Sequence, residues 1–168
     1  VFGWFAPLAT LMGDEQRALL DGCYDAEVAT QDEQLGVFFD RMQTSGALDR
    51  TLVVVTADHG DHLGEHHFLG HSVSLYDVLV HVPLIIRDPA GALPRATVRD
   101  DFVSTRRLFH TVLTAAGLGA EHEQAYTLAR DPAHDPDRGV VFAEAVTPQN
   151  VLNLMQKHKP DLVRERMC

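Results

Sequence analysis

The sequence predicts an α/β fold, in which a mostly parallel sheet is flanked by helices. Three observations lead to this prediction: helical and strand patterns alternate along the chain, two runs of β-branched residues are continuous, and a polar loop follows the first run. The chain has 168 residues, of which 45% are hydrophobic and 23% charged, and this composition is typical of a globular domain. We therefore expect one compact region rather than a repeat or a disordered segment.

The first predicted element is a helix from Asp14 to about Thr44. Apolar or partly apolar residues recur there every three or four positions, which is the spacing of an amphipathic helix. Gly46 is placed to end it. The recurring residues are Leu20, Tyr24, Val28, Leu35, Phe38, Phe39 and Met42.

Two strands are predicted at 51–57 and 82–87. Both are continuous apolar runs, which favours strands buried on both faces of a parallel sheet over strands with one face in solvent. Pro83 lies near the start of the second run, where a missing amide donor is tolerated. In such sheets, ligands bind beyond the carboxyl ends of the strands.

Further elements follow the second strand. Ser104 or Thr105 can cap a helix that continues to about Ala116, and Gly117 is placed to terminate it. The segment 119–138 is predicted to be a loop, 140–143 a short strand and 148–159 a last helix. The apolar face expected for the first of these helices comprises Val103, Leu108, Val112, Leu113 and Ala116.

Charge and hydropathy exclude two classes of partner. The net charge of -10 would repel a polyanion, and the basic residues form no stripe, so we expect no nucleic-acid binding. No stretch reaches the ~18 consecutive apolar residues of a membrane span. Localisation and oligomeric state are left open. The abrupt ends indicate a piece of a longer protein.

A histidine-rich loop follows the first predicted strand, and six of the ten histidines lie between positions 59 and 81. Asp58 and His59 come directly after that strand, where a carboxylate and an imidazole can bind one divalent cation if Gly60 lets the backbone turn away. Two ligands do not hold a cation tightly, so others must come from this loop or from elsewhere. The alternative is a solvated loop whose histidines bond backbone groups.

Four motifs follow one another from the end of the first strand: Thr56-Ala-Asp-His-Gly-Asp-His-Leu-Gly-Glu-His66, Gly70-His71, Tyr76-Asp77 and His81-Val-Pro-Leu-Ile-Ile-Arg-Asp-Pro89. As an ordered set they resemble the sulfatase family of the alkaline phosphatase superfamily. The resemblance covers residues 23–117 well and the rest weakly. It identifies 1–168 as part of a sulfatase-like catalytic domain with an alkaline phosphatase-like fold.

The resemblance implies roles for three residues. In the family, an Asp followed by Asn or His binds the active-site divalent cation, which places these roles on Asp58 and His59. Calcium is the expected ion, with manganese or zinc as alternatives because imidazole is softer than an amide oxygen. A later basic residue contacts the sulfate, and His71 occupies that place as the candidate catalytic residue. Residues His62, Glu65 and His66 could orient the ligands or lie on the surface.

The family's nucleophile has no match in this chain. Sulfatases mature a cysteine to formylglycine within a Cys-x-Pro-x-Arg motif near the amino terminus, and Cys23 and Cys168 both lack that context. The resemblance therefore implies that the formylglycine and further metal-binding aspartates precede Val1. It also implies that this portion is inactive alone.

The function implied is the hydrolysis of a sulfate ester, either a small molecule or a sulfated glycan. An alternative in the same superfamily is a phosphoesterase or a phosphonate ester hydrolase. A third alternative, from a different class, is a non-catalytic metal-binding or interaction module.

Overall fold

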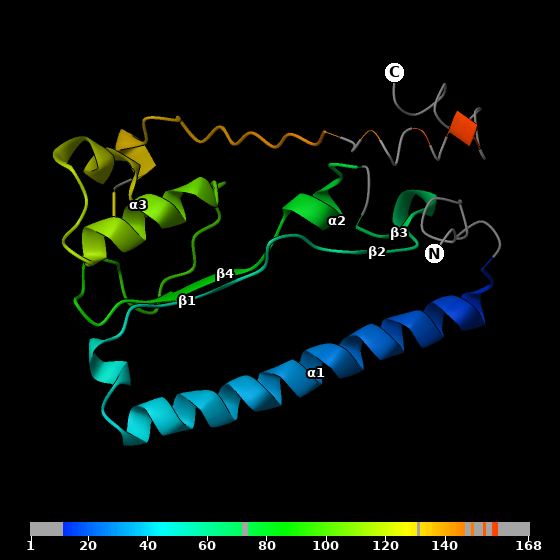
Figure 1. Cartoon of the computed structure of the whole chain (residues 1–168), viewed down its shortest axis with the longest axis horizontal. Helices are drawn as coiled ribbons and strands as arrows, with labels where there is room; N and C mark the ends of the chain where they lie inside the picture. The colour runs from blue at the N-terminus through cyan, green and yellow to red at the C-terminus, as the bar shows by residue number, and fades with distance from the viewer. Residues whose placement is uncertain are drawn as a thin grey trace. The chain divides into compact units, whose positions relative to one another are not determined.

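The structure, a computed structural model, describes residues 12–71, 74–130 and 132–146, together with positions 149, 153, 156 and 157. Its α-helices and strands are α1 (Asp14–Thr44), β1 (Val53–Thr56), β2 (His62–Leu63), β3 (Leu69–Gly70), α2 (Asp77–Val80), β4 (Leu84–Arg87) and α3 (Arg106–Ala115). Short 3-10 helices span Leu48–Arg50, Glu65–His67, Glu121–Tyr126 and Pro132–His134. Both helices and strands are present, as predicted for an α/β domain (Figure 1).

The chain separates into two compact units. Unit 1 consists of Val1–Thr30, Ala57–Val82 and Ala143–Cys168, and unit 2 consists of Gln31–Thr56 and Pro83–Phe142. Unit 1 contains the histidine-rich loop, while unit 2 contains β1, β4 and α3.

Helix α1 begins and ends where the sequence predicts. Gly13 donates its amide to the Gln16 side chain at 2.7 Å, which satisfies a donor that the first turn leaves unpaired. Asp14 in the first turn and Arg41 in the last turn both suit the helix dipole. Beyond Thr44 the backbone turns at Gly46, whose φ of 69° favours glycine.

Both strand pairs in the described residues are antiparallel. In unit 2, β1 pairs with β4 from Val53 opposite Arg87 to Thr56 opposite Leu84. In unit 1, β2 and β3 form a small hairpin. The strands form where β-branched runs predicted them, but the mostly parallel sheet is not confirmed.

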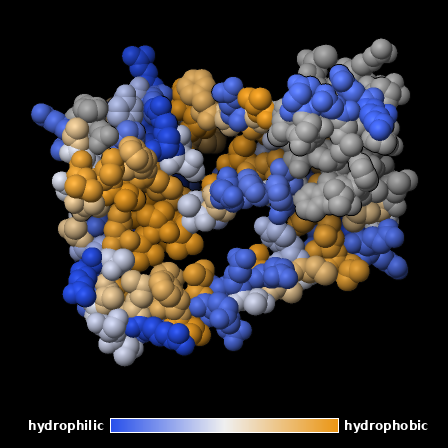
Figure 2. Space-filling model, viewed as in Figure 1, coloured by the Kyte–Doolittle hydropathy of each residue, from blue (hydrophilic) through white to orange (hydrophobic). Residues whose placement is uncertain are grey.

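Burial in unit 2 is lower than a doubly covered sheet requires. Residues 53–55 of β1 are half-buried, Ile85 of β4 is 64% exposed, and no residue of α1 is buried. Figure 2 shows apolar surface gathered over the part of the molecule that holds β1 and β4. A hollow of about 400 Å³ is lined there by Asp32, Leu35, Gly36, Phe39, Leu48, Val53, Val55, Ile85 and Arg87.

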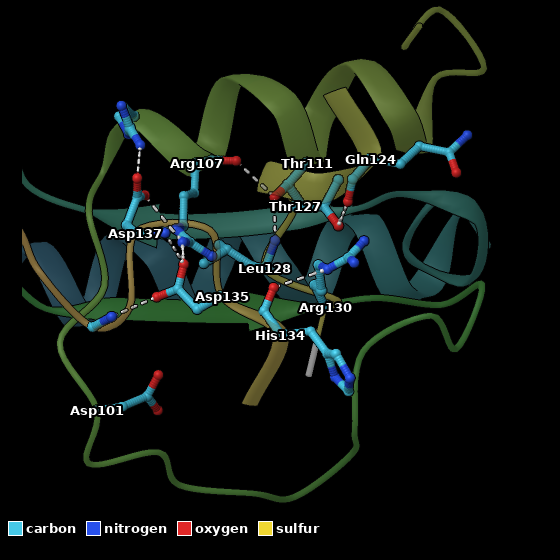
Figure 3. Close-up of polar contacts among 12 residues, drawn as sticks. Asp101, Arg107, Thr111, Gln124, Thr127, Leu128, Arg130, His134, Asp135 and Asp137 are labelled. Atoms are coloured by element: carbon cyan, nitrogen blue, oxygen red, sulfur yellow. Dashed lines mark hydrogen bonds and ion pairs between the residues drawn. The ribbon is translucent and has the colours of Figure 1, made fainter. Parts of the chain in front are cut away.

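Helix α3 buries two polar residues, and the predicted apolar face is only partly covered. Arg107 and Thr111 are its buried residues, while Val112 is 47% exposed. The Arg107 guanidinium binds the carboxylates of Asp135 and Asp137, and the Thr111 hydroxyl accepts the Leu128 amide at 3.0 Å (Figure 3). The loop that follows α3 is therefore held by polar pairs, while Val103, Leu108 and Leu113 of the predicted apolar face are half-buried.

The last two predicted elements differ in outcome. The short strand expected at Val140–Ala143 is wrong, because these residues are irregular and Phe142 is 88% exposed. A strand needs a neighbour for its backbone groups, and no described strand pairs with this segment. Most of the helix expected at 148–159 lies outside the described residues.

Candidate functional site

The candidate site lies in unit 1, in the segment that follows β1. Gly60 anchors its start, because its amide donates to the Leu79 carbonyl of α2 at 2.9 Å. A Cβ at Gly60 would lie 2.0 Å from the Val78 carbonyl oxygen, a distance no real side chain adopts. Only glycine therefore lets the backbone after Asp58 and His59 pass this close to α2.

The hairpin formed by β2 and β3 shapes the rest of the segment. His62 pairs with Gly70, and Leu63 pairs with Leu69. Continued one position outward, this antiparallel register brings Asp61 opposite His71. The turn includes Gly64 at φ 123°, and the Gly64 carbonyl accepts a hydrogen bond from Arg17 of α1 at 3.1 Å.

His62 of β2 is fully buried at 1% exposure. Its Nε2 lies 2.9 Å from the Ser74 hydroxyl, and its ring centroid lies 5.3 Å from Phe68 and 5.8 Å from Tyr76. His66 stacks on Tyr76 at 3.7 Å. Burial lowers the pKa of His62 despite the opposing charge of Glu65. These contacts give buried His62 a packing role, while His66 stays exposed with one ring face against Tyr76.

Two of the predicted site residues, His59 and His71, lie close together. His59 and His71 stack with ring centroids 4.1 Å apart and an interplanar angle of 27°. Their side chains are 42% and 41% exposed, which leaves both rings within reach of a ligand. The segment thus brings together two histidines that are twelve positions apart in the sequence.

The ring nitrogens of both histidines have defined roles. His59 Nδ1 lies 3.0 Å from the Gly60 carbonyl oxygen, which can only accept a hydrogen bond, so Nδ1 is the donor in this contact. His71 Nδ1 lies 2.8 Å from Asp61 Oδ1, which gives the same assignment. In each ring Nε2 is the nitrogen suited to act as a ligand or an acceptor.

Two sets of donors could hold a divalent cation. His59 Nε2 and Asp58 Oδ2 are 3.8 Å apart, and one ion can bridge that gap because two metal–ligand bonds of ~2.0 to 2.6 Å together exceed it. The second set is His59, Asp61 and His71, whose ligand atoms all lie within 4.8 Å of one another. His59 belongs to both sets, and the mixture of carboxylate and imidazole suits a cation.

The outcome differs among the predicted residues. The structure brings the rings of His59 and His71 together. The Asp58 side chain is 90% exposed and contacts His59. Sequence reasoning missed Asp61. Its link to His71 depends on the register of a two-residue strand pair, and no spacing rule for metal ligands or helices reveals that register.

The chain is similar in sequence to known sulfatases. The family model described as Sulfatase matches residues 11–118, more than half of the 168 residues. An arylsulfatase of Volvox carteri is 31% identical over 138 residues, which cover 77% of this chain and 20% of the relative. Arylsulfatase K of Bos taurus is 34% identical over 95 residues, covering 56% of this chain and 17% of the relative.

A third relative broadens the set. The multifunctional alkaline phosphatase superfamily protein PehA of Trinickia caryophylli is 31% identical over 94 residues, covering 56% of this chain and 18% of the relative. The chain spans about a fifth of the length of these curated relatives. No solved structure matches.

The family match covers α1, β1, the histidine-rich loop, β4 and α3, so the sequence resemblance is confirmed over the elements that carry it. The chain belongs to the sulfatase family of the alkaline phosphatase superfamily, whose fold is of the α/β class.

Proposed function

We propose that the complete protein is a metal-dependent sulfuric ester hydrolase, and that this chain is the downstream part of its catalytic domain. Three residues at the family's motif positions support this function. Asp58 Oδ2 lies 3.8 Å from His59 Nε2, and the His71 ring stacks on His59. A carboxylate, a ligand nitrogen and a second imidazole are thus gathered within one short segment.

Asp58 and His59 are the proposed metal ligands. With Nδ1 donating to the Gly60 carbonyl oxygen, Nε2 is the nitrogen through which a neutral His59 would bind a cation. A bound divalent cation would polarise the sulfuryl oxygens of the ester. Calcium is the first candidate, and its ~6 to 8 oxygen ligands require further donors from the preceding part of the protein. Manganese or zinc would suit the imidazole better.

His71 is the proposed catalytic residue. With Nδ1 held by Asp61, its Nε2 is the nitrogen that would face the ester. A protonated His71 would neutralise charge on the ester oxygens or donate a proton to the departing alkoxide. The proposed nucleophile is a formylglycine outside this chain.

The proposed substrate is a sulfate ester of a small molecule or of a glycan, and we expect no nucleic-acid partner given the net charge of -10. Of the helices that the structure describes, none has the length and apolar content needed to cross a membrane. A phosphoesterase or phosphonate ester hydrolase is the second candidate, because one relative is named a multifunctional member of the superfamily. A non-catalytic metal-binding module is the third.

In the complete domain, β1 and β4 would belong to a larger, mostly parallel sheet. The exposure of Ile85 and the apolar hollow beside β1 and β4 support this, since both would be covered by additional strands or helices.

Metal binding tests the assignment of ligands. We expect Asp58→Ala and His59→Ala each to lower the affinity for calcium, manganese or zinc by about tenfold or more in calorimetric titration, as removal of a ligand does. The matched control is Asp21→Ala, an exposed carboxylate on α1 of the same unit. Unchanged affinity in both site variants would remove the ligand assignment.

Activity tests the reaction class. The complete protein, expressed with its preceding segment and a formylglycine-generating enzyme, should hydrolyse an aryl sulfate faster than the matching aryl phosphate or phosphonate ester. His71→Ala should lower kcat for the sulfate by ~100-fold or more. A preference for the phosphate would favour the second candidate. We expect the 168-residue chain alone to be inactive.

A further inference from the structure

Asp61 contacts the proposed catalytic residue His71 but has no role of its own in the proposed function. Its Oδ1 lies 2.8 Å from His71 Nδ1. The two side chains are 35% and 41% exposed, so the pair is partly shielded from water. A hydrogen bond to a carboxylate is stronger than one between neutral groups, and it selects the tautomer of the ring.

The backbone holds this pair in place from both sides. The β2–β3 register sets Asp61 opposite His71, and the amide of Gly60, which precedes Asp61, donates to Leu79 of α2. Next to Asp61, the ring of buried His62 lies 2.9 Å from the Ser74 hydroxyl. The backbone of Asp61 is therefore restrained by the β2–β3 pairing on one side and by the Gly60–Leu79 hydrogen bond on the other.

Two contacts then restrain the His71 ring. Stacking on His59 at 4.1 Å sets the plane of the ring, while rotation about its Cβ–Cγ bond would exchange the places of the ring's nitrogens and carbons. The Asp61 carboxylate opposes that rotation, because only one orientation donates Nδ1–H to it. The consequence is that Nε2 points away from Asp61.

We propose that Asp61 is a positioning residue for His71, which acts by fixing the tautomer and the ring orientation of the imidazole that contacts the ester. This inference rests on the proposed role of His71 and adds a residue to it. A ring held in place stabilises the charge that develops on the ester oxygens more effectively, since it needs no reorientation during the reaction. In this proposal Asp61 acts on His71 rather than on the cation, although Asp61 also belongs to the second set of donors described above.

The ¹⁵N chemical shifts of the His71 ring test the proposal independently of activity. In the chain at a pH where His71 is neutral, we expect the Nδ1–H tautomer to dominate. Asp61→Ala should return His71 to the tautomer mixture of free imidazole, and Asp61→Asn, which keeps an acceptor oxygen but no charge, should give an intermediate result. The matched control is Asp77→Ala, which removes a carboxylate beside His81 instead. An unchanged His71 tautomer in Asp61→Ala overturns the proposal.

Metal affinity and kinetics separate positioning from ligation. Asp61→Ala should leave the affinity for calcium, manganese and zinc within about twofold, and in the complete enzyme it should lower kcat by about tenfold with little change in KM, as loss of an orienting partner does. A loss of metal affinity equal to that of His59→Ala would make Asp61 a ligand and overturn the positioning role. If the complete protein hydrolyses no ester, the proposed function fails while the tautomer still decides whether Asp61 orients His71.

Discussion

The two units use charged and titratable side chains in opposite ways. In unit 2, Arg107 is 7% exposed and binds two carboxylates, so its charge is fully paired within the protein. In unit 1, Asp58 is 90% exposed, and its contact with His59 is a loose 3.8 Å. Buried and fully paired groups hold a structure together, whereas accessible groups with remaining lone pairs can bind a ligand.

The largest expected effect is a loss of stability in unit 2, where Arg107 is paired with carboxylates. Arg107→Ala leaves the Asp135 carboxylate, only 12% exposed, without its guanidinium partner. Breaking a buried ion pair costs ~3 to 5 kcal/mol, so we expect a loss of about that size in the free energy of unfolding of unit 2, measured with urea. The matched control is Arg106→Ala, whose side chain is 56% exposed and should matter less. Equal losses in the two variants would contradict the role of burial.

The next effect concerns the backbone that carries the site. Gly60→Ala would place a methyl group against the Val78 carbonyl and break the bond from Gly60 to Leu79. Forcing an atom into an occupied position costs ~1 to 3 kcal/mol, so the amide of residue 60 should lose protection from hydrogen exchange and metal affinity should fall. Gly22→Ala on α1 is the control, since nothing lies within 4 Å of its Cβ. Full protection in Gly60→Ala would show that the close approach to α2 is not required.

The smallest effect is a difference in acid sensitivity. Burial lowers the pKa of His62 below 6.5, so folded unit 1 binds fewer protons than the unfolded chain. The free energy of unfolding of unit 1 therefore decreases as the pH falls below 6.5. In unit 2, hydrogen bonds from Arg106 and Arg107 lower the pKa of Asp137 below 3.8. That contribution is present above pH 3.8 and is lost as the pH falls through the lowered value.

Amide exchange followed from pH 7.5 to 3 checks this order. The Leu79 amide of unit 1 should lose protection at a higher pH than the Leu128 amide of unit 2. His62→Gln, which cannot titrate, should move the loss in unit 1 to lower pH. Simultaneous loss at both amides, with no effect of the variant, would contradict the assignment of the transitions to these two groups.

Local patterns in the sequence predicted much of the secondary structure. The period of the apolar residues and Gly46 located α1, and the β-branched runs located β1 and β4, because these signals depend on neighbours within a few positions. The strand expected at Val140–Ala143 did not form, since an apolar run becomes a strand only beside another strand. The same limit applies to α3, whose buried Arg107 is explained by carboxylates about thirty positions away.

The sequence by itself determined the family, the order of the main elements and the choice of Asp58, His59 and His71 as candidates, because the family's motifs are patterns of residue types in a fixed order along the chain. Only the tertiary structure decided that the His59 and His71 rings stack and that Asp61 meets His71. The physical reason is that these contacts depend on strand register and on the passage of Gly60 past α2, and both are set by hydrogen bonds between residues distant in sequence.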